Sequence, residues 1–415
     1  MNPPAPVTRT LRPAQELSRA LGDGTEAIYS VMRMLVCVPW YAPARAFGGT
    51  VTAAVATVKG AVEAGHEVTV ATTDVLDLAS RVPADAPTEP ARARVVRFPN
   101  LSQRLAATNV PLPRGLRRWL REHVREFDLV LLLDVYSSVS VLGARAAARA
   151  GVPYVLEALG TLPPTPERGR ALPKRAFLAF WGRRTVREAA ACLYLSDVER
   201  DEYLAQGAEP ARLHPMPPPL DLPSSNGVAK AVAPTIVYLG QLHPIKRIDV
   251  LLEAFARVRA ELPEARLEVN GAPSAHGEAL REQTARLGLG DSVAFRGLIP
   301  EEAKATALGS AHVFALLSAS EGLPITPLEA LACGTPVVLS PGCGLRQVDG
   351  VGGIVCDGTA AGAAAALLAL LRDPERARQL GEAGRAFAAS YRREKVVPEL
   401  VALLERVATS SSSAA

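Results

Sequence analysis

Hydrophobic and polar positions along the chain follow two patterns, short apolar runs and longer segments with helical periodicity. In the first half, runs typical of buried strands lie at 32–41, 66–73, 128–135, 152–160 and 191–196. Segments such as 50–65 lie between them, with apolar residues at helical spacing. Strands that alternate with helices predict a parallel, doubly wound sheet.

The same pattern restarts after a change in composition. Residues 214–234 are rich in proline, serine and glycine, which is typical of an interdomain linker. Beyond them, strands are predicted at 235–240, 265–271, 292–297, 311–318 and 336–340, with helices over 248–262 and 277–288. We therefore predict an α/β fold of two Rossmann-like, doubly wound parallel-sheet domains that face each other across a cleft. Their expected bounds are 32–215 and 235–385, with a linker at 216–234.

The two ends of the chain have different compositions from these domains. Residues 1–31 are a polar leader without the apolar core of a secretory signal, and we expect them to be disordered. A C-terminal helix is predicted over 386–408, in a position to return to the first domain. The serine-rich tail 409–415 is expected to be disordered.

The composition is typical of a globular protein, with 48% hydrophobic and 21% charged residues among 415. The run of five apolar residues at 129–133 is far too short to span a bilayer. The five cysteines form no CxxC pair, and the six histidines are scattered. We therefore expect neither a disulfide framework nor a metal site, which favours a reducing cytoplasm.

The formal net charge is +4, and the basic excess is concentrated in 114–127 and 168–189. Both segments interleave arginine with aromatic residues, which are Trp119, Phe177, Phe180 and Trp181. One interpretation is a basic amphipathic helix that lies on an anionic membrane surface. The other is an aromatic stripe that faces the core below a solvated arginine face. No nucleic-acid-binding motif accompanies the charge, so no nucleic-acid partner is predicted.

Candidate chemistry is concentrated in the stretch SEGLPITPLEALACGTPVV, which begins at Ser320. Thr326, Pro327 and Glu329 predict a helix N-terminus with a capping box, so Glu329 has a structural interpretation. Glu321 also has an interpretation without a function, as a solvated carboxylate in a loop. Lys246 follows the strand at 235–240, and with the amides of the helix N-terminus it is suited to a diphosphate. Glutamates in the same region can accept hydrogen bonds from sugar hydroxyls, so we predict a nucleotide-sugar site.

A glycine pair stands before the first predicted helix. Gly48 and Gly49 immediately precede the helix at 50–65. Small residues at a helix N-terminus allow a phosphate to approach closely. A tight turn explains the pair equally well.

The stretch with Glu321 and Glu329 resembles the E-x7-E signature of retaining glycosyltransferases of the GT-B fold, family 4. The segments FGGTVTAAVATVKGAVEAGHEVTVATT, GVPYVLEALGTLPP and ACLYLSDVERDEYLAQG are similar to the amino-terminal domain of this family. The segments YLGQLHPIKRIDVLLEAF and DSVAFRGLIPEEAKATALGSAHVFALLSASEGLPITPLEALACGTPVV are similar to its donor domain. The resemblance covers nearly the whole chain from about residue 33.

The resemblance implies a role for each matching position. Glu321 would contact hydroxyls of the donor sugar, Lys246 would neutralise the departing diphosphate, and Glu329 would bind the ribose. The backbone at Pro324, Ile325 and Thr326 would lie against the phosphates, although Pro324 has no amide hydrogen to donate. The remaining donor-site positions would be Gly48 and Gly49 near the phosphates, Gln241 beside them, and Arg296 and Leu298 near the nucleobase.

The chain departs from the family pattern at several of these places. Gln241 stands where the family usually has arginine, so one positive charge near the diphosphate is missing. Leu159 precedes Gly160 where many members have histidine, and other histidines are replaced after the strand at 128–133. On the acceptor side, Asp134, Tyr136 and Glu157 are candidate replacements.

The implied function is transfer of a hexosyl unit from a nucleoside diphosphate sugar to an acceptor hydroxyl with retention of anomeric configuration. The acceptor would be a glycan, a glycolipid or a small molecule, in cell-envelope or extracellular polysaccharide synthesis. The expected place is the cytoplasm, at the inner face of the cytoplasmic membrane, with peripheral contact through the basic segments. No cofactor and no metal are expected. Two alternatives are a sugar-nucleotide epimerase of the same architecture and a non-catalytic nucleotide-sugar-binding protein.

Overall fold

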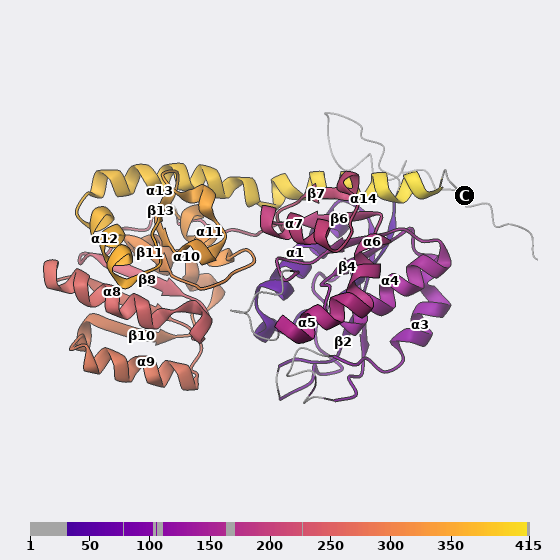
Figure 1. Cartoon of the computed structure of the whole chain (residues 1–415), viewed down its shortest axis with the longest axis horizontal. Coiled ribbons are helices and arrows are strands. Elements are labelled where there is room, and N and C mark those ends of the chain that lie inside the picture. Colours follow the sequence, from indigo (N-terminus) through magenta and orange to yellow (C-terminus); the bar gives the residue numbers. More distant parts are fainter. Residues whose placement is uncertain are drawn as a thin grey trace, which may run out of the picture.

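The computed structural model describes residues 31–77, 79–102, 105, 111–162, 171–225 and 227–412. The predicted leader, apart from Val31, lies outside these residues, and so do the last three positions of the predicted tail. Two α/β halves lie side by side along the long axis of the molecule (Figure 1).

The first half is built on a seven-stranded parallel sheet. Its strands lie in the order β3-β2-β1-β4-β5-β6-β7, which extends the Rossmann order by one strand. Their bounds are β1 Arg33–Cys37, β2 Glu67–Thr73, β3 Arg94–Phe98, β4 Leu129–Leu133, β5 Tyr154–Glu157, β6 Ala191–Tyr194 and β7 Leu213–Pro215.

The second half repeats this topology with six parallel strands, in the order β10-β9-β8-β11-β12-β13. Their bounds are β8 Thr235–Leu239, β9 Arg266–Asn270, β10 Val293–Gly297, β11 Val313–Leu316, β12 Val337–Leu339 and β13 Gly353–Val355. The predicted fold class is therefore confirmed, with the carboxyl ends of both sets of strands available for a site between the halves.

Helices cover both faces of each sheet (Figure 1). In the first half they are α1 Gly49–Glu63, α3 Leu116–His123, α4 Ser138–Ala150, α5 Ala171–Phe177, α6 Arg183–Arg187 and α7 Asp197–Ala205. In the second half they are α8 Ile248–Glu261, α9 Ala275–Arg286, α10 Glu301–Ser310, α11 Ile325–Ala332, α12 Ala360–Leu371 and α13 Pro374–Ala388. None of the described helices is long and apolar enough to cross a membrane.

The alternation of side chains along β1 divides the core of the first half into two layers. Met34 and Val36 pack in the layer with α1, while Leu35 and Cys37 pack in the layer with α3 and α4. Because successive strand residues point to opposite faces, an unbroken apolar strand needs helices on both sides.

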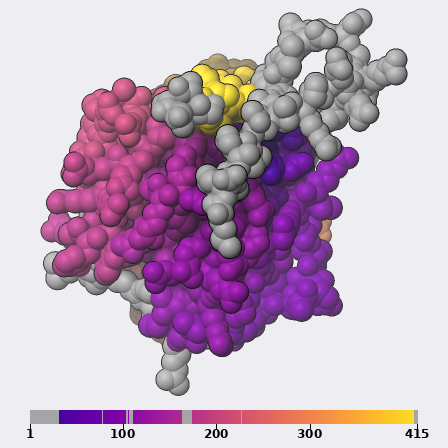
Figure 2. Space-filling model, turned by 90° about the vertical axis from the view of Figure 1, so that its right-hand side faces the viewer, coloured from indigo at the N-terminus to yellow at the C-terminus, as the bar shows by residue number. Residues whose placement is uncertain are grey.

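The last helix, α14 (Arg393–Ser412), joins the first of these layers. Its apolar residues Val396, Leu400, Leu403, Leu404 and Val407 pack in the same core cluster as α1. The chain therefore ends on the first half after completing the second. Figure 2 shows the end of the molecule formed by the first half, with α14 in yellow at its upper edge.

Several predicted bounds were wrong. The helix expected over 386–408 is two helices, because the backbone at Arg392 is extended between α13 and α14. Residues 409–412, predicted as a disordered tail, continue α14, whose preceding turns are held by Leu404 and Val407.

Candidate functional site

A cavity of about 490 Å³ lies between the two halves. From the first half it is lined by the loop that enters α1, by Leu159 and Thr161 after β5, and by Leu195 after β6. From the second half it is lined by the loop after β8 and by the loop between β11 and α11. All of these loops follow strands, so the cavity lies at the carboxyl edges of both sheets.

Lys246 and Glu321 meet in this cavity. Lys246 ends a short 3-10 turn, Pro244–Lys246, which His243 caps by accepting the N–H of Ile245 at Nδ1, 3.2 Å away. The Lys246 Nζ atom lies 2.6 Å from Oε1 of Glu321. The hydroxyl of Ser318 donates to the same oxygen over 2.5 Å. Both charged side chains are largely buried, so the ammonium is fixed beside the carboxylate at the wall of the cavity.

The first turn of α11 forms the adjoining wall. The helix begins at Ile325, with Pro324 in the N-cap position and no side chain capping it. Pro327 is then the third helical residue, where its missing N–H breaks no intrahelical bond. The amides of Ile325 and Thr326 belong to the first turn, whose N–H groups have no intrahelical partner and carry the positive end of the helix dipole.

The predicted capping box at Thr326 and Glu329 was therefore wrong. Thr326 lies inside the helix, and Oε1 of Glu329 accepts from Nζ of Lys304, 3.1 Å away on α10. Burial raises the pKa of Glu329, and the Lys304 ammonium opposes that effect. Glu329 does not line the cavity. No motif in the sequence indicates Lys304 as the partner of Glu329.

The glycine pair of the first half faces this helix. Gly48 has φ +66° and ψ −138°, a conformation that glycine adopts without strain. A Cβ atom on Gly49 would lie 3.5 Å from Cδ1 of Ile325, and one on Gly48 would lie 3.9 Å from Nε2 of Gln241. The structure therefore brings Gly48, Gly49 and Gln241 together with the first turn of α11.

A second pair of glycines joins the halves next to Glu321. Gly160 has φ +70°, and a Cβ atom placed on it would lie 2.5 Å from Cα of Gly322. Only glycine permits this approach of two backbones. The preceding residue, Leu159, has φ +52°, a conformation that costs a non-glycine residue roughly 1–2 kcal/mol.

Glu199, which the sequence analysis missed, holds two of the loops that line the cavity. Its Oε1 accepts the N–H of Gly160 over 2.7 Å, and its Oε2 accepts the N–H of Leu195 over 2.9 Å. The residue is buried. Its sequence signal is the S-x-x-E pattern of Ser196 and Glu199, which predicts the cap that Ser196 provides but not these long-range bonds.

The predicted acceptor-side residues lie at the ends of β4 and β5, outside the cavity lining. Asp134 has φ +135°, and burial raises the pKa of its carboxyl group, although the hydroxyl of Ser137 and nearby backbone amides oppose the shift. The hydroxyl of Tyr136 donates to the carbonyl oxygen of Leu162 over 2.5 Å. Burial, and then the neighbouring Glu199, raise the pKa of Glu157 to about 8. Their roles in acceptor binding stay predictions.

Arg296 and Leu298 also lie outside the cavity lining. The Arg296 guanidinium pairs with Glu268 on the neighbouring strand at 3.0 Å, and Leu298 is 76% exposed. Their predicted contact with a nucleobase stays a prediction.

The two basic aromatic segments differ in where their rings lie. Trp119 packs against Phe98 and Phe127 in the core, as the interpretation of a core-facing stripe requires. In the other segment, Phe180 is 74% exposed and Trp181 is 43% exposed, so these rings form a surface.

Comparisons with known proteins agree with this architecture. A profile described as "Glycosyl transferase 4-like domain" matches residues 48–219, and one described as "Glycosyl transferases group 1" matches residues 227–387. HepE of Anabaena, solved in complex with UDP and glucose, superposes with a TM-score of 0.71 at 17% identity, over 90% of this chain and 100% of that chain. WaaG, a glycosyltransferase involved in lipopolysaccharide biosynthesis, superposes with a TM-score of 0.64 at 18% identity, over 89% of this chain and 99% of that chain.

Curated relatives share about a third of their residues with this chain over part of their length. A D-inositol 3-phosphate glycosyltransferase of Segniliparus rotundus is 33% identical over 211 residues, 47% of each chain. A GDP-mannose-dependent alpha-(1-6)-phosphatidylinositol monomannoside mannosyltransferase of Mycolicibacterium smegmatis is 32% identical over 228 residues, 50% of this chain and 59% of the relative. The chain spans about half the length of the curated relatives it matches.

The two parallel sheets and the site between their carboxyl edges define a protein of the GT-B class. Within that class, the two adjoining profile matches place the chain in the glycosyltransferase family of the group 1 and family 4 type, and it belongs to that family.

Proposed function

We propose that the protein transfers a hexosyl unit from a nucleoside diphosphate sugar to an acceptor hydroxyl, with retention of anomeric configuration. The observation that carries this proposal is the cavity between the sheets. In it, Lys246, Glu321 and the first turn of α11 face the Gly48–Gly49 loop.

Each feature of the cavity has a counterpart in the donor. The amides of the first turn of α11 and its dipole favour the diphosphate. The Lys246 ammonium has three N–H donors; Glu321 accepts one, and the others are available to phosphate oxygens. Glu321 then accepts hydrogen bonds from the sugar hydroxyls beside the reacting carbon.

In the proposed reaction, the bond from the anomeric carbon to the β-phosphate oxygen breaks, and a bond from the acceptor oxygen forms on the same face of the sugar. The acceptor proton passes to the departing phosphate oxygen, so the products are a glycoside and a nucleoside diphosphate. Negative charge grows on that phosphate as the bond breaks. Lys246 and α11 would stabilise the growing charge and so accelerate the reaction. No metal ion or cofactor takes part in the proposed reaction.

The proposed acceptor is a glycan, a glycolipid or a small polyol. The names of the curated relatives support this class, since they refer to inositol phosphate and to phosphatidylinositol mannoside. We propose that the protein acts in envelope polysaccharide or glycolipid synthesis, in the cytoplasm at the membrane surface. The exposed Phe180 and Trp181, flanked by arginines, support peripheral contact there.

The experiment that tests donor binding is a thermal-shift panel with UDP, GDP, ADP and dTDP sugars. A ligand that binds the folded state raises the unfolding midpoint by mass action. We expect one base to raise the midpoint of the wild type and the shift to shrink strongly in Lys246→Ala. The control Lys59→Ala removes a surface lysine that pairs with Asp221 at 3.0 Å, and it should keep the full shift. An equal shift in both variants, or none with any nucleotide, would contradict the proposed donor site.

A further inference from the structure

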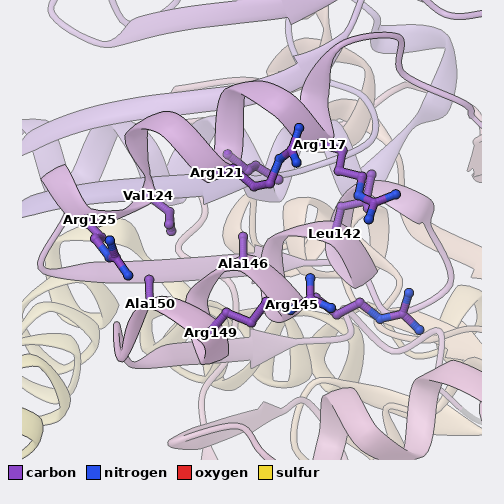
Figure 3. A pocket seen from close by; sticks show the side chains of 10 residues that line it. Arg117, Arg121, Val124, Arg125, Leu142, Arg145, Ala146, Arg149 and Ala150 are labelled. Carbon is purple, nitrogen blue, oxygen red and sulfur yellow. The ribbon is translucent and has the colours of Figure 1, made fainter.

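A groove of about 290 Å³ runs between α3 and α4. These two helices lie at the end of the molecule away from the second sheet (Figure 1). Its floor is apolar and consists of Leu120, Val124, Leu142, Ala146 and Ala150. Five arginine side chains form the rest of the lining, and they come from both helices and from the turn after α3 (Figure 3). They are Arg117, Arg121, Arg125, Arg145 and Arg149. No acidic side chain belongs to the described lining.

The arginines are spaced so that they repel one another. Arg117 and Arg121 are four residues apart on α3, and Arg145 and Arg149 are four apart on α4. Like charges at this spacing destabilise a helix. Within the described part of the chain, none of these four side chains forms an ion pair with a carboxylate.

Two arginines outside the groove, one of them on α3 itself, are paired with glutamates four residues further along their helix. Arg118, next to Arg117 in sequence, pairs with Glu122 at 2.9 Å, and Arg184 pairs with Glu188 on α6 at 2.8 Å. Among the described residues, Arg117, Arg121, Arg145 and Arg149 therefore lack the carboxylate partner that Arg118 and Arg184 have. An anionic ligand between the helices would remove the repulsion.

We propose that this groove binds a phosphate-bearing ligand. The guanidinium group presents a planar fork of donors that matches phosphate geometry, whereas a lysine offers only a point charge, and every cation in the groove is arginine. From Arg117 to Arg125 the groove is about 12 Å long at ~1.5 Å per residue. That length suits two or three linked phosphates or a phospholipid headgroup. The site shares no residue with the cavity between the sheets, so it does not depend on the proposed transfer reaction.

The test compares two double variants that each remove two positive charges. Arg121→Gln/Arg145→Gln changes the groove, and Arg118→Gln/Arg184→Gln changes two arginines outside it. Both are made in a Lys246→Ala background, so that phosphate binding in the cavity between the sheets contributes little. Inorganic tripolyphosphate is titrated by calorimetry at low salt. In parallel, the proteins are sedimented with phosphatidylglycerol-containing vesicles and with phosphatidylcholine vesicles.

We expect at least a tenfold loss of affinity for tripolyphosphate, for phosphatidylglycerol vesicles or for both in the groove variant, and less than a twofold change in the control. Loss in the vesicle arm alone identifies a lipid headgroup as the source of the phosphate, and loss with tripolyphosphate alone identifies a soluble ligand. Without ligand, the groove variant should melt at the same temperature as its parent or higher, because repulsion is relieved. Equal losses of affinity in both double variants would mean that binding depends only on the overall charge of the protein, and this would overturn the proposal. The proposal would also be overturned if the parent protein bound neither tripolyphosphate nor phosphatidylglycerol vesicles.

Discussion

Replacement of Lys246 by alanine removes the ammonium group that contacts Glu321 at the wall of the cavity. A unit charge about 3 Å away in a medium of effective dielectric about 20 contributes roughly 5 kcal/mol. About half of a unit of charge develops on the departing phosphate in the transition state, so the differential effect is roughly 3 kcal/mol, which corresponds to about a hundredfold or more in rate. We therefore expect kcat to fall by about 10²–10³ in Lys246→Ala.

The assay is release of nucleoside diphosphate in the presence of acceptor, measured at saturating donor so that kcat and KM are separated. Among the described residues, Lys246→Ala leaves the largely buried Glu321 carboxylate with the Ser318 hydroxyl as its side-chain partner, which should lower the free energy of unfolding by about 1–3 kcal/mol. Lys59→Ala is the matched control, because its partner Asp221 is half exposed and such pairs contribute about 1 kcal/mol or less. A folded Lys246→Ala protein with kcat within threefold of the wild type would refute the role of this residue.

Three further changes have defined outcomes. Gly160→Ala should abolish most turnover, because its Cβ atom would overlap Gly322 of the other half. The control is Gly151→Ala, which has φ +71° and no neighbour within 4 Å and should lower stability by only roughly 1–2 kcal/mol. Equal kcat in the two variants would show that the contact between Gly160 and Gly322 does not affect turnover. The pKa of Glu157 is raised to about 8 from 4.5, so the folded state holds the proton more tightly and stability should fall as pH rises between these values. Denaturant titrations of Glu157→Gln should lack this loss, and an identical pH profile in the variant would contradict the assignment. Gln241→Arg adds a charge beside Gly48 and should tighten nucleoside diphosphate binding by up to about tenfold in calorimetry, and weaker binding would count against a diphosphate there.

Periodicity in the sequence predicted the two-domain α/β fold because most strands of both sheets are continuous apolar runs. Three strands were missed. β7 has only three residues, one of them proline, and β13 has three residues and begins with glycine. β3 lies at the sheet edge, and two of its five residues are arginines. Such short or edge strands are defined by their neighbours more than by their own composition.

Local motifs predicted those parts of the site that depend on neighbouring residues in the sequence, but not the contacts between distant elements. Lys246 and Glu321 follow strands, and the topology that brings adjacent strand ends together brings them into contact. The predicted capping box does not form because the helix begins at Ile325, before Thr326, and because Lys304 on another helix pairs with Glu329. Glu199 and Gly160 are 39 positions apart, and no local pattern encodes their hydrogen bond. Contacts of this kind depend on the packing of whole elements and become visible only in three dimensions.

The most direct test of the proposed reaction is proton NMR of the product formed from the nucleotide sugar that the thermal-shift panel identifies. We expect acceptor-dependent release of nucleoside diphosphate, with one equivalent of a glycoside that has the same anomeric configuration as the donor. A product of inverted configuration, or conversion of the donor sugar to its epimer without acceptor, would contradict it.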